Sequence, residues 1–285
     1  MSLAYSIIYT AENSYEHWVH KADWQFLIIP ETNASQEFIS IEFTNSINAV
    51  NHFSINGYGF PTIRIHPKQQ FKEISFKAAF TLLKKEVNPF DFEPPKDPKE
   101  AYNKIGKLDF KVDFESFLTP TPYTLIPQKH HDIYLFDVTK SIFENLQELK
   151  HWTYLKIYFK TGVTDVNTTV DEIIDKRHGV CQDFAHLFCA IARLNGIPSR
   201  YVSGYLHQGN GYFGDSQMHA WVESYVPFVG WVGFDPTNDI LVGTNHIKVS
   251  HGKDYKDCSP LRGVVLSKGT NETRHTVQVL GQQQQ

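Results

Sequence analysis

Short runs of alternating apolar and polar residues fill the first third of the chain. Aromatic and β-branched residues dominate these runs, and asparagine, glycine and proline separate them, which is typical of β-strands and turns. Strands at this spacing favour a sandwich or barrel-like sheet, so we predict a β-rich N-terminal domain over residues 1–90. The predicted strands cover residues 4–9, 24–29, 37–44, 49–54, 62–67 and 74–85.

Beyond residue 90 the pattern becomes proline-rich and then helical. Residues 88–100 hold four prolines among charged residues, a composition that favours an extended linker. Further along, apolar residues recur at the spacing of one face of a helix. The predicted helices cover residues 139–156, 169–176 and 181–194.

Strand-like runs dominate the remainder of the chain from residue 199 onward. Helical runs followed by strand-like runs are typical of an α+β fold. We therefore predict a second domain over residues 91–285, linker included, with its core at about 139–245. The predicted strands include residues 218–225, 230–235 and 276–280, with a hairpin tip or loop at 209–211.

Composition narrows the class of protein. The 285 residues suffice for one large domain or two ordinary ones, and 41% hydrophobic with 20% charged residues is typical of a globular protein. A net charge of −4 gives no electrostatic case for nucleic acid. No segment approaches the roughly 20 apolar residues that span a bilayer, and the N-terminus lacks the features of a signal peptide. We expect no membrane partner and a cytoplasmic location.

Cys181 is the first candidate for chemistry, because it stands where the third predicted helix begins. Free N–H groups and the positive end of the helix dipole meet at such a position. Both favour the thiolate, which is the nucleophilic form of cysteine, and the same N–H groups are potential oxyanion donors. The alternative is an inert core residue, since free cysteine is often buried.

His219 and Asp235 are the second and third candidates. His219 lies in the predicted strand 218–225, and Asp235 ends the predicted strand 230–235. If the two strands form a hairpin centred near Pro227, the two residues fall opposite one another and share a face of the sheet. A carboxylate beside an imidazole fixes its tautomer and supports the imidazolium. The alternatives are a core histidine and a turn-forming aspartate.

The other cysteines carry no comparable signal. Three cysteines without a Cys-x-x-Cys spacing argue against a disulfide framework and against a structural zinc site. Cys189 lies among apolar residues of the predicted helix, so we expect it in the core. Cys258 follows Asp257 in a polar stretch, so we expect it to be exposed. A zinc site that uses Cys181, His219 and Asp235 as ligands is a remote alternative.

Residues 158–238 resemble the transglutaminase-like superfamily, and within it most of all a bacterial branch of candidate cysteine peptidases. The resemblance rests on many short motifs in the same order. A C-terminal stretch, 251–264, and more weakly an N-terminal one, 5–16, resemble the same branch. The motifs are Gly-Val-Cys-Gln-Asp-Phe-Ala-His at 179–186, Gly-Ile-Pro at 196–198, Arg-Tyr-Val-Ser-Gly-Tyr at 200–205, His-Ala-Trp-Val-Glu at 219–223 and Gly-Trp-Val-Gly-Phe-Asp-Pro-Thr-Asn at 230–238.

The resemblance implies a papain-like, transglutaminase-like fold in which the helix that bears Cys181 packs on an antiparallel sheet. It also implies a catalytic triad of Cys181, His219 and Asp235, and amide chemistry through a thioester. Either water or an amine then accepts the acyl group. The crosslinking enzymes of animals carry tryptophan directly after the catalytic cysteine, where this chain has Gln182, so we predict hydrolysis. The predicted function is a cysteine peptidase or amidohydrolase. The alternatives are a protein-glutamine transglutaminase and a non-catalytic binding or scaffold protein that retains the fold.

No cofactor and no metal enter this predicted reaction. The expected partner is a peptide or protein substrate, with no nucleic acid and no membrane. Neither the identity of the substrate nor the oligomeric state follows from the sequence, because both depend on the shapes of loops and surfaces.

Overall fold

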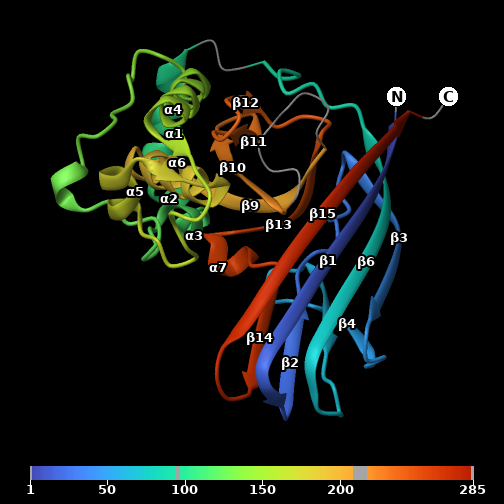
Figure 1. Ribbon diagram of the computed structural model, residues 1–285. Coiled ribbons are helices and arrows are strands. Elements are labelled where there is room, and N and C mark those ends of the chain that lie inside the picture. Colours follow the sequence, from blue (N-terminus) through green and yellow to red (C-terminus); the bar gives the residue numbers. More distant parts are fainter. Residues whose placement is uncertain (1, 94–96, 208–216, 284–285) are drawn as a thin grey trace.

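The computed structural model describes residues 2–93, 97–207 and 217–283 and has an α+β fold, as predicted. Figure 1 shows helices gathered on one side of the molecule and long strands running side by side on the other. The three larger sheets are antiparallel. In the described residues, no helix is both long enough and apolar enough to cross a bilayer.

Two four-stranded sheets form the β-rich half. Their buried aromatic residues pack together, with Phe26 and Phe76 at 4.8 Å between ring centroids. All six strands predicted near the N-terminus are present; five have ends shifted by a few residues, and the first runs to Val19 instead of ending at residue 9. The first sheet has the order β15-β1-β6-β3 and consists of β1 (Ser2–Val19), β3 (Gln36–Asn45), β6 (Phe71–Lys85) and β15 (Asn271–Gln283). The second has the order β14-β2-β5-β4 and consists of β2 (Lys21–Phe26), β4 (Asn51–Ile55), β5 (Pro61–Ile65) and β14 (Leu261–Leu266).

The sheets do not follow the predicted division into residues 1–90 and 91–285. Strands β14 and β15 come from the end of the chain, yet they pair with β2 and β1 of the β-rich half. The C-terminal segment therefore belongs to the same sheets as the N-terminus. Strand pairing between distant segments leaves no mark in local periodicity. The sequence pattern therefore did not show that the end of the chain pairs with its N-terminal strands.

A five-stranded sheet forms the centre of the other half. Helix α6 lies against β10, and side chains of β9 and β13 enter the core of the β-rich half, including Tyr205 and Ile247. The sheet is therefore covered on both faces. Its order is β12-β11-β10-β9-β13, with β9 (Ser199–Leu206), β10 (His219–Val226), β11 (Gly230–Asp235), β12 (Ile240–Leu241) and β13 (His246–Gly252).

The predicted helices are confirmed as α4 (Ile142–Lys156), α5 (Val170–Lys176) and α6 (Cys181–Leu194). Gly196, at φ 76°, follows α6 and ends it, as expected for a left-handed position. The hairpin tip predicted at 209–211 lies outside the described residues. The remaining short elements are α1 (Pro98–Gly106), α2 (Leu108–Asp113), α3 (Glu115–Leu118), η1 (Gln128–His130), β7 (Tyr158–Phe159), β8 (His178–Gly179) and α7 (Tyr255–Cys258).

Helix α1 begins inside the predicted linker 88–100, so the linker prediction is wrong for residues 98–100. Asp97 caps the helix by accepting a hydrogen bond from the Lys99 N–H, and Pro98 occupies its first turn. Proline is well tolerated there because the missing N–H has no partner within the helix. The same proline that indicates a linker in the sequence therefore starts a helix.

Candidate active site

The Cys181 thiol lies at the first residue of α6, as the sequence predicts, and is half-buried. As the first helical residue, Cys181 has a backbone N–H without an acceptor inside the helix. The neighbouring Val180 N–H donates to Asp183 Oδ2 at 2.7 Å, and the Thr164 hydroxyl donates to the same oxygen at 2.7 Å. The buried Asp183 side chain thus fixes the turn that presents the thiol.

Gly179, two residues before Cys181, is set by a close contact and not by its backbone angles. Its φ is not in the left-handed region, so it is not required for a tight entry turn. A Cβ at this position would instead lie 2.5 Å from Asp183 Oδ2. Glycine is therefore required because the backbone passes directly against the carboxylate that holds the start of α6.

His219 is the first residue of β10, and its ring is fully buried. Nε2 lies 2.8 Å from Asp235 Oδ2, within the range of a hydrogen bond to a carboxylate. The other nitrogen, Nδ1, is buried and has no hydrogen-bond partner among the described residues. Nδ1 is therefore the atom available to a thiol, and Cys181 and His219 line the same cavity.

The electrostatics of this group favour an imidazolium. Burial lowers the pKa of His219, but the Asp235 carboxylate, the hydrogen bond to it and the Cys181 thiol outweigh burial and raise the pKa from 6.5 to about 10. Burial also disfavours the charged form of Asp235. The charge of His219 and hydrogen bonds from His219 and His246 nevertheless hold the pKa of Asp235 well below its ordinary value.

The register of β10 and β11 differs from the predicted one. Val226 pairs with Gly230 and Val222 with Phe234, so the hairpin is centred on residue 228. If this register continues by one residue, Asp235 of β11 lies opposite Trp221 of β10, which is two residues from His219. Because side chains alternate between faces with a period of two, a shift by two keeps His219 and Asp235 on the same face. The predicted juxtaposition is confirmed, whereas the predicted direct pairing is wrong.

Backbone and side-chain donors surround the Asp235 carboxylate, which is fully buried. Oδ1 accepts hydrogen bonds from the backbone N–H groups of Thr237 at 3.0 Å and Asn238 at 3.3 Å. Oδ2 accepts from the Asn238 side chain at 2.8 Å and contacts His246 Nε2 at 3.1 Å. The turn that follows Pro236 thus holds the carboxylate.

Sequence reasoning missed His246. The chain contains 14 histidines, and nothing in local periodicity distinguishes this one. Its strand, β13, lies at the edge of the sheet, and β10 and β9 lie between it and β11. An alignment that shows His246 varying together with Asp235 would have been the signal that finds it.

A cavity of about 250 Å³ contains Cys181 and His219. Its walls also come from the β-rich half, through Tyr9 of β1 and His275 of β15, whose side chains are 3.1 Å apart. Among the described lining residues there is no aspartate, glutamate, lysine or arginine. The thiol therefore faces a small space that both halves of the molecule enclose, and the His219 imidazolium is its charged group among the described lining residues.

The other two cysteines are buried. Cys189 is fully buried in α6, as predicted, and burial raises its pKa to about 12. Cys258 was expected to be exposed, but it is also fully buried. Helix α7 turns its side chain inward, where the thiol lies 3.8 Å from the Tyr201 carbonyl oxygen, and burial strongly raises its pKa. The prediction that Cys258 is exposed, which rested on its polar neighbours in the sequence, is therefore wrong.

Two groups in the described residues have side chains suited to a metal ion. One is His219, Asp235 and His246, and the other is His130, Asp171 and Asp175. Neither includes Cys181, so neither is the zinc site considered from the sequence. In the second group, Lys129 Nζ lies 2.8 Å and His130 Nε2 3.3 Å from Asp171 Oδ1. The Lys129 ammonium and the His130 ring tie η1 to α5, and Lys129 offsets the charge of Asp171.

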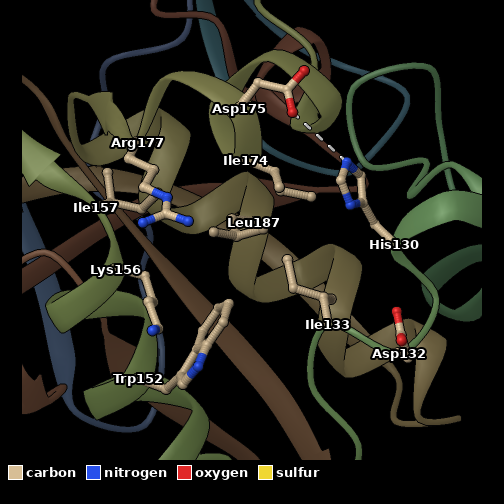
Figure 2. A pocket seen from close by; sticks show the side chains of 10 residues that line it. All are labelled: His130, Asp132, Ile133, Trp152, Lys156, Ile157, Ile174, Asp175, Arg177 and Leu187. Carbon is tan, nitrogen blue, oxygen red and sulfur yellow. Dashed lines mark ion pairs between the residues drawn. The ribbon is translucent and has the colours of Figure 1, made fainter.

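A separate hollow of about 460 Å³ lies beside this second group (Figure 2). His130 and Asp175 stand on one side of it, and Trp152 and Lys156 of α4 stand on the other. Its lining contains no cysteine or serine among the described residues. The described lining of this hollow offers no thiol or hydroxyl nucleophile, so the cavity at Cys181 is the candidate active site.

Comparisons with known proteins agree with the α+β fold described above. Residues 135–236 match the family model described as Transglutaminase-like superfamily. A crystal structure of a candidate cysteine protease from Cytophaga hutchinsonii superposes with a TM-score of 0.80 at 19% identity, covering 100% of this chain and 92% of that chain. At this identity the likeness shows the fold alone.

Two curated relatives match shorter stretches. The uncharacterized protein ML0607 of Mycobacterium leprae is 34% identical over 176 residues, which are 58% of this chain and 61% of ML0607. A protein-glutamine gamma-glutamyltransferase of Pseudomonas aeruginosa is 34% identical over 87 residues, 28% of this chain and 13% of that protein. The chain thus spans less than two thirds of the length of these relatives.

Proposed function

We propose that this chain, which carries a transglutaminase-like domain over residues 135–236, is a cysteine hydrolase that cleaves amide bonds of peptides or proteins. The observation that carries the proposal is the 2.8 Å contact between His219 Nε2 and Asp235 Oδ2, with the buried Nδ1 not engaged by another described residue and with Cys181 and His219 lining one cavity. A nucleophile, a base and an orienting carboxylate are the parts of a covalent acyl-transfer site.

The first half-reaction forms a thioester. His219 Nδ1 takes the proton of the Cys181 thiol, and the sulfur attacks the carbonyl carbon of the amide. The backbone N–H of Cys181 is positioned at the start of α6 to donate to the developing oxyanion. The C–N bond breaks as the His219 imidazolium protonates the leaving nitrogen, and an amine departs.

The second half-reaction releases the acyl group. Neutral His219 accepts a proton from water, whose oxygen attacks the thioester carbonyl carbon. The C–S bond breaks, a carboxylic acid leaves, and the proton returns to the Cys181 sulfur. Asp235 remains an anion throughout, orients the imidazole through Nε2–H and stabilises its cationic form.

The lining of the cavity indicates which substrate side chains fit beside the scissile amide. The His219 imidazolium is already paired with Asp235, and no described lining residue carries a carboxylate, an ammonium or a guanidinium, so a charged side chain would enter without a free partner. An uncharged residue beside the scissile amide is therefore favoured. Tyr9, Tyr201 and Tyr255 supply aromatic surface for it.

Two other functions share the fold. A protein-glutamine transglutaminase would pass the same acyl group to an amine, and one matched relative carries a transferase name of that kind. A non-catalytic binding protein would need no imidazole–carboxylate pair next to a thiol. All three cysteines are free, which is compatible with a reducing compartment, and the cytoplasmic location stays a prediction.

A peptide-library experiment tests the proposal. Peptides that vary one position through leucine, phenylalanine, glutamine, lysine and glutamate are incubated with the wild type and with Cys181→Ala. We expect cleavage by the wild type alone, fastest with uncharged residues, and a peptide-sized mass increase on Cys181 after rapid acid quenching. Cleavage that survives Cys181→Ala, or the absence of any covalent adduct together with no cleavage, contradicts the proposal.

A further inference from the structure

His246 contacts the same carboxylate oxygen as His219 does. It is the first residue of β13, its ring is almost fully buried, and its Nε2 lies 3.1 Å from Asp235 Oδ2. The ring also packs edge-on against Trp221 at 5.2 Å between centroids. Asp235 therefore stands between two imidazoles, only one of which lines the cavity.

The hydrogen bonds of His246 define its tautomer. The backbone N–H of Gly243 donates to Nδ1 at 3.3 Å, so Nδ1 is an acceptor and Nε2 carries the proton. Nε2–H then donates to Asp235 Oδ2. A metal bound at Nε2 would require the proton on Nδ1, where it would face the Gly243 N–H. This geometry favours a hydrogen-bond donor over a metal ligand.

The surroundings of His246 keep it neutral. Burial lowers its pKa, and the positive charges of His219 and Lys84 act in the same direction, while Asp235 opposes them. A second cation beside Asp235 would compete with His219 for the same anion. A neutral donor stabilises the carboxylate without that competition.

The β-rich half fixes the backbone of His246. The buried Lys84 ammonium of β6 donates to the His246 carbonyl oxygen at 2.6 Å. Gln36 of β3 accepts from the Lys248 N–H at 3.0 Å and donates to the Lys248 carbonyl oxygen at 2.7 Å. The first residues of β13 are therefore held by the sheet that lies behind it.

We propose that His246 is a positioning residue, a neutral donor that holds Asp235 Oδ2 toward His219 Nε2. This inference rests on the proposed function, because it assigns a role within the same Cys181–His219–Asp235 group. It goes beyond the three residues that the sequence indicated. Asn238 and the turn after Asp235 hold the carboxylate from one side, and His246 holds it from the other.

The rate at which iodoacetamide alkylates Cys181, measured across pH, tests the role without any substrate. The compared proteins are wild type, His246→Leu and His246→Gln, whose amide N–H can replace the donor. We expect His246→Leu to lower the rate on the acid side by on the order of tenfold, the effect of one hydrogen bond to a charged group. The rates should converge at alkaline pH, and His246→Gln should restore most of the loss.

Imidazole nitrogen NMR of labelled protein supplies a second readout. We expect His246 to remain neutral with the proton on Nε2 between about pH 5 and pH 8, a range in which an ordinary histidine titrates. Titration of His246 in that range, an Nδ1–H tautomer, or a stoichiometric shift of Nε2 on adding Zn²⁺ overturns the proposal. Equal alkylation profiles for wild type and His246→Leu also overturn it.

The experiments distinguish failure of the proposed hydrolase function from failure of the positioning role of His246. A protein that cleaves no amide yet shows the expected alkylation profiles and His246 tautomer lacks the hydrolase activity but retains the positioning role. Thermal unfolding of both variants separates positioning from folding, because a loss caused by unfolding lowers alkylation specificity at every pH and is not restored by His246→Gln.

Discussion

A methyl group added to Gly179 would meet the Asp183 carboxylate oxygen at 2.5 Å. That oxygen accepts two hydrogen bonds of 2.7 Å, from the Val180 N–H and the Thr164 hydroxyl. Gly179 and Asp183, which flank Cys181 in the sequence, therefore pack directly against each other. The position of the thiol depends on a side chain that itself performs no chemistry.

Gly179→Ala tests the close contact between residue 179 and the Asp183 side chain. The added Cβ must displace Asp183, so we expect a loss of about 1–3 kcal/mol in the free energy of unfolding, as overpacking typically causes. Cys181 alkylation should slow as well, because the start of α6 moves. Urea unfolding and alkylation rates measure both. Gly106→Ala is the matched control, since its Cβ would meet no atom within 4 Å, and a similar loss in both variants would contradict the steric explanation.

Cys181 should be the only thiol that reacts rapidly in the folded protein. Cys189 and Cys258 are fully buried, and burial raises the pKa of each. Cys181 is half-buried and lines a cavity with an imidazole. Brief treatment with iodoacetamide near pH 6, followed by peptide mass mapping, should mark Cys181 alone. Early labelling of Cys258 would contradict this prediction.

Asp235→Asn should cost activity far more than stability. The amide cannot support the imidazolium, and in a comparable triad such a change lowers kcat on the order of 10⁴-fold. The pKa of His219, about 10 in the presence of the carboxylate, should fall. Steady-state kinetics on a cleaved peptide and NMR titration of His219 measure the two effects. An unchanged His219 titration would contradict the role of Asp235.

The raised pKa of His219 also predicts a pH-dependent stability. Its pKa is about 10 in the folded state against an ordinary 6.5, so the folded state binds the extra proton between these values. Its contribution to stability is fully present below about pH 6.5 and is lost as pH rises toward 10. The stability difference between wild type and His219→Gln should narrow over that interval in urea unfolding. A difference that widens would mean that His219 is neutral when folded.

Elements with strong local signals were predictable from the sequence. Helix α6 and its glycine stop follow from apolar spacing and from the left-handed position of Gly196. Thr169 caps α5 through a reciprocal pair with Glu172, which is a local pattern too. Contacts between distant segments were not predictable. The return of β15 to β1, the inward turn of Cys258 and the approach of His246 to Asp235 depend on tertiary packing, which a single sequence does not encode in its periodicity.

Hydrolysis should prevail over amine transfer. The thioester at Cys181 can be opened by water or by a primary amine, and efficient transfer requires a site that shields the thioester from water. The residue after the nucleophile is Gln182, whose mostly buried side chain lines the cavity and reaches toward the Asp165 carbonyl oxygen at 3.5 Å. A polar side chain at this position gives less hydrophobic cover than an indole.

Competition between the two acceptors measures this preference. Glutamine-containing peptides are incubated with a labelled primary amine in isotopically labelled water, using wild type and Cys181→Ala. We expect Cys181-dependent release of free acid that carries label from the water, and much slower incorporation of the amine. Aromatic residues of the cavity, among them Tyr9 and Tyr201, are the alternative source of shielding. If they suffice, Cys181-dependent amine incorporation will outpace the release of acid, and the protein is then a transglutaminase that lacks the tryptophan of the animal enzymes.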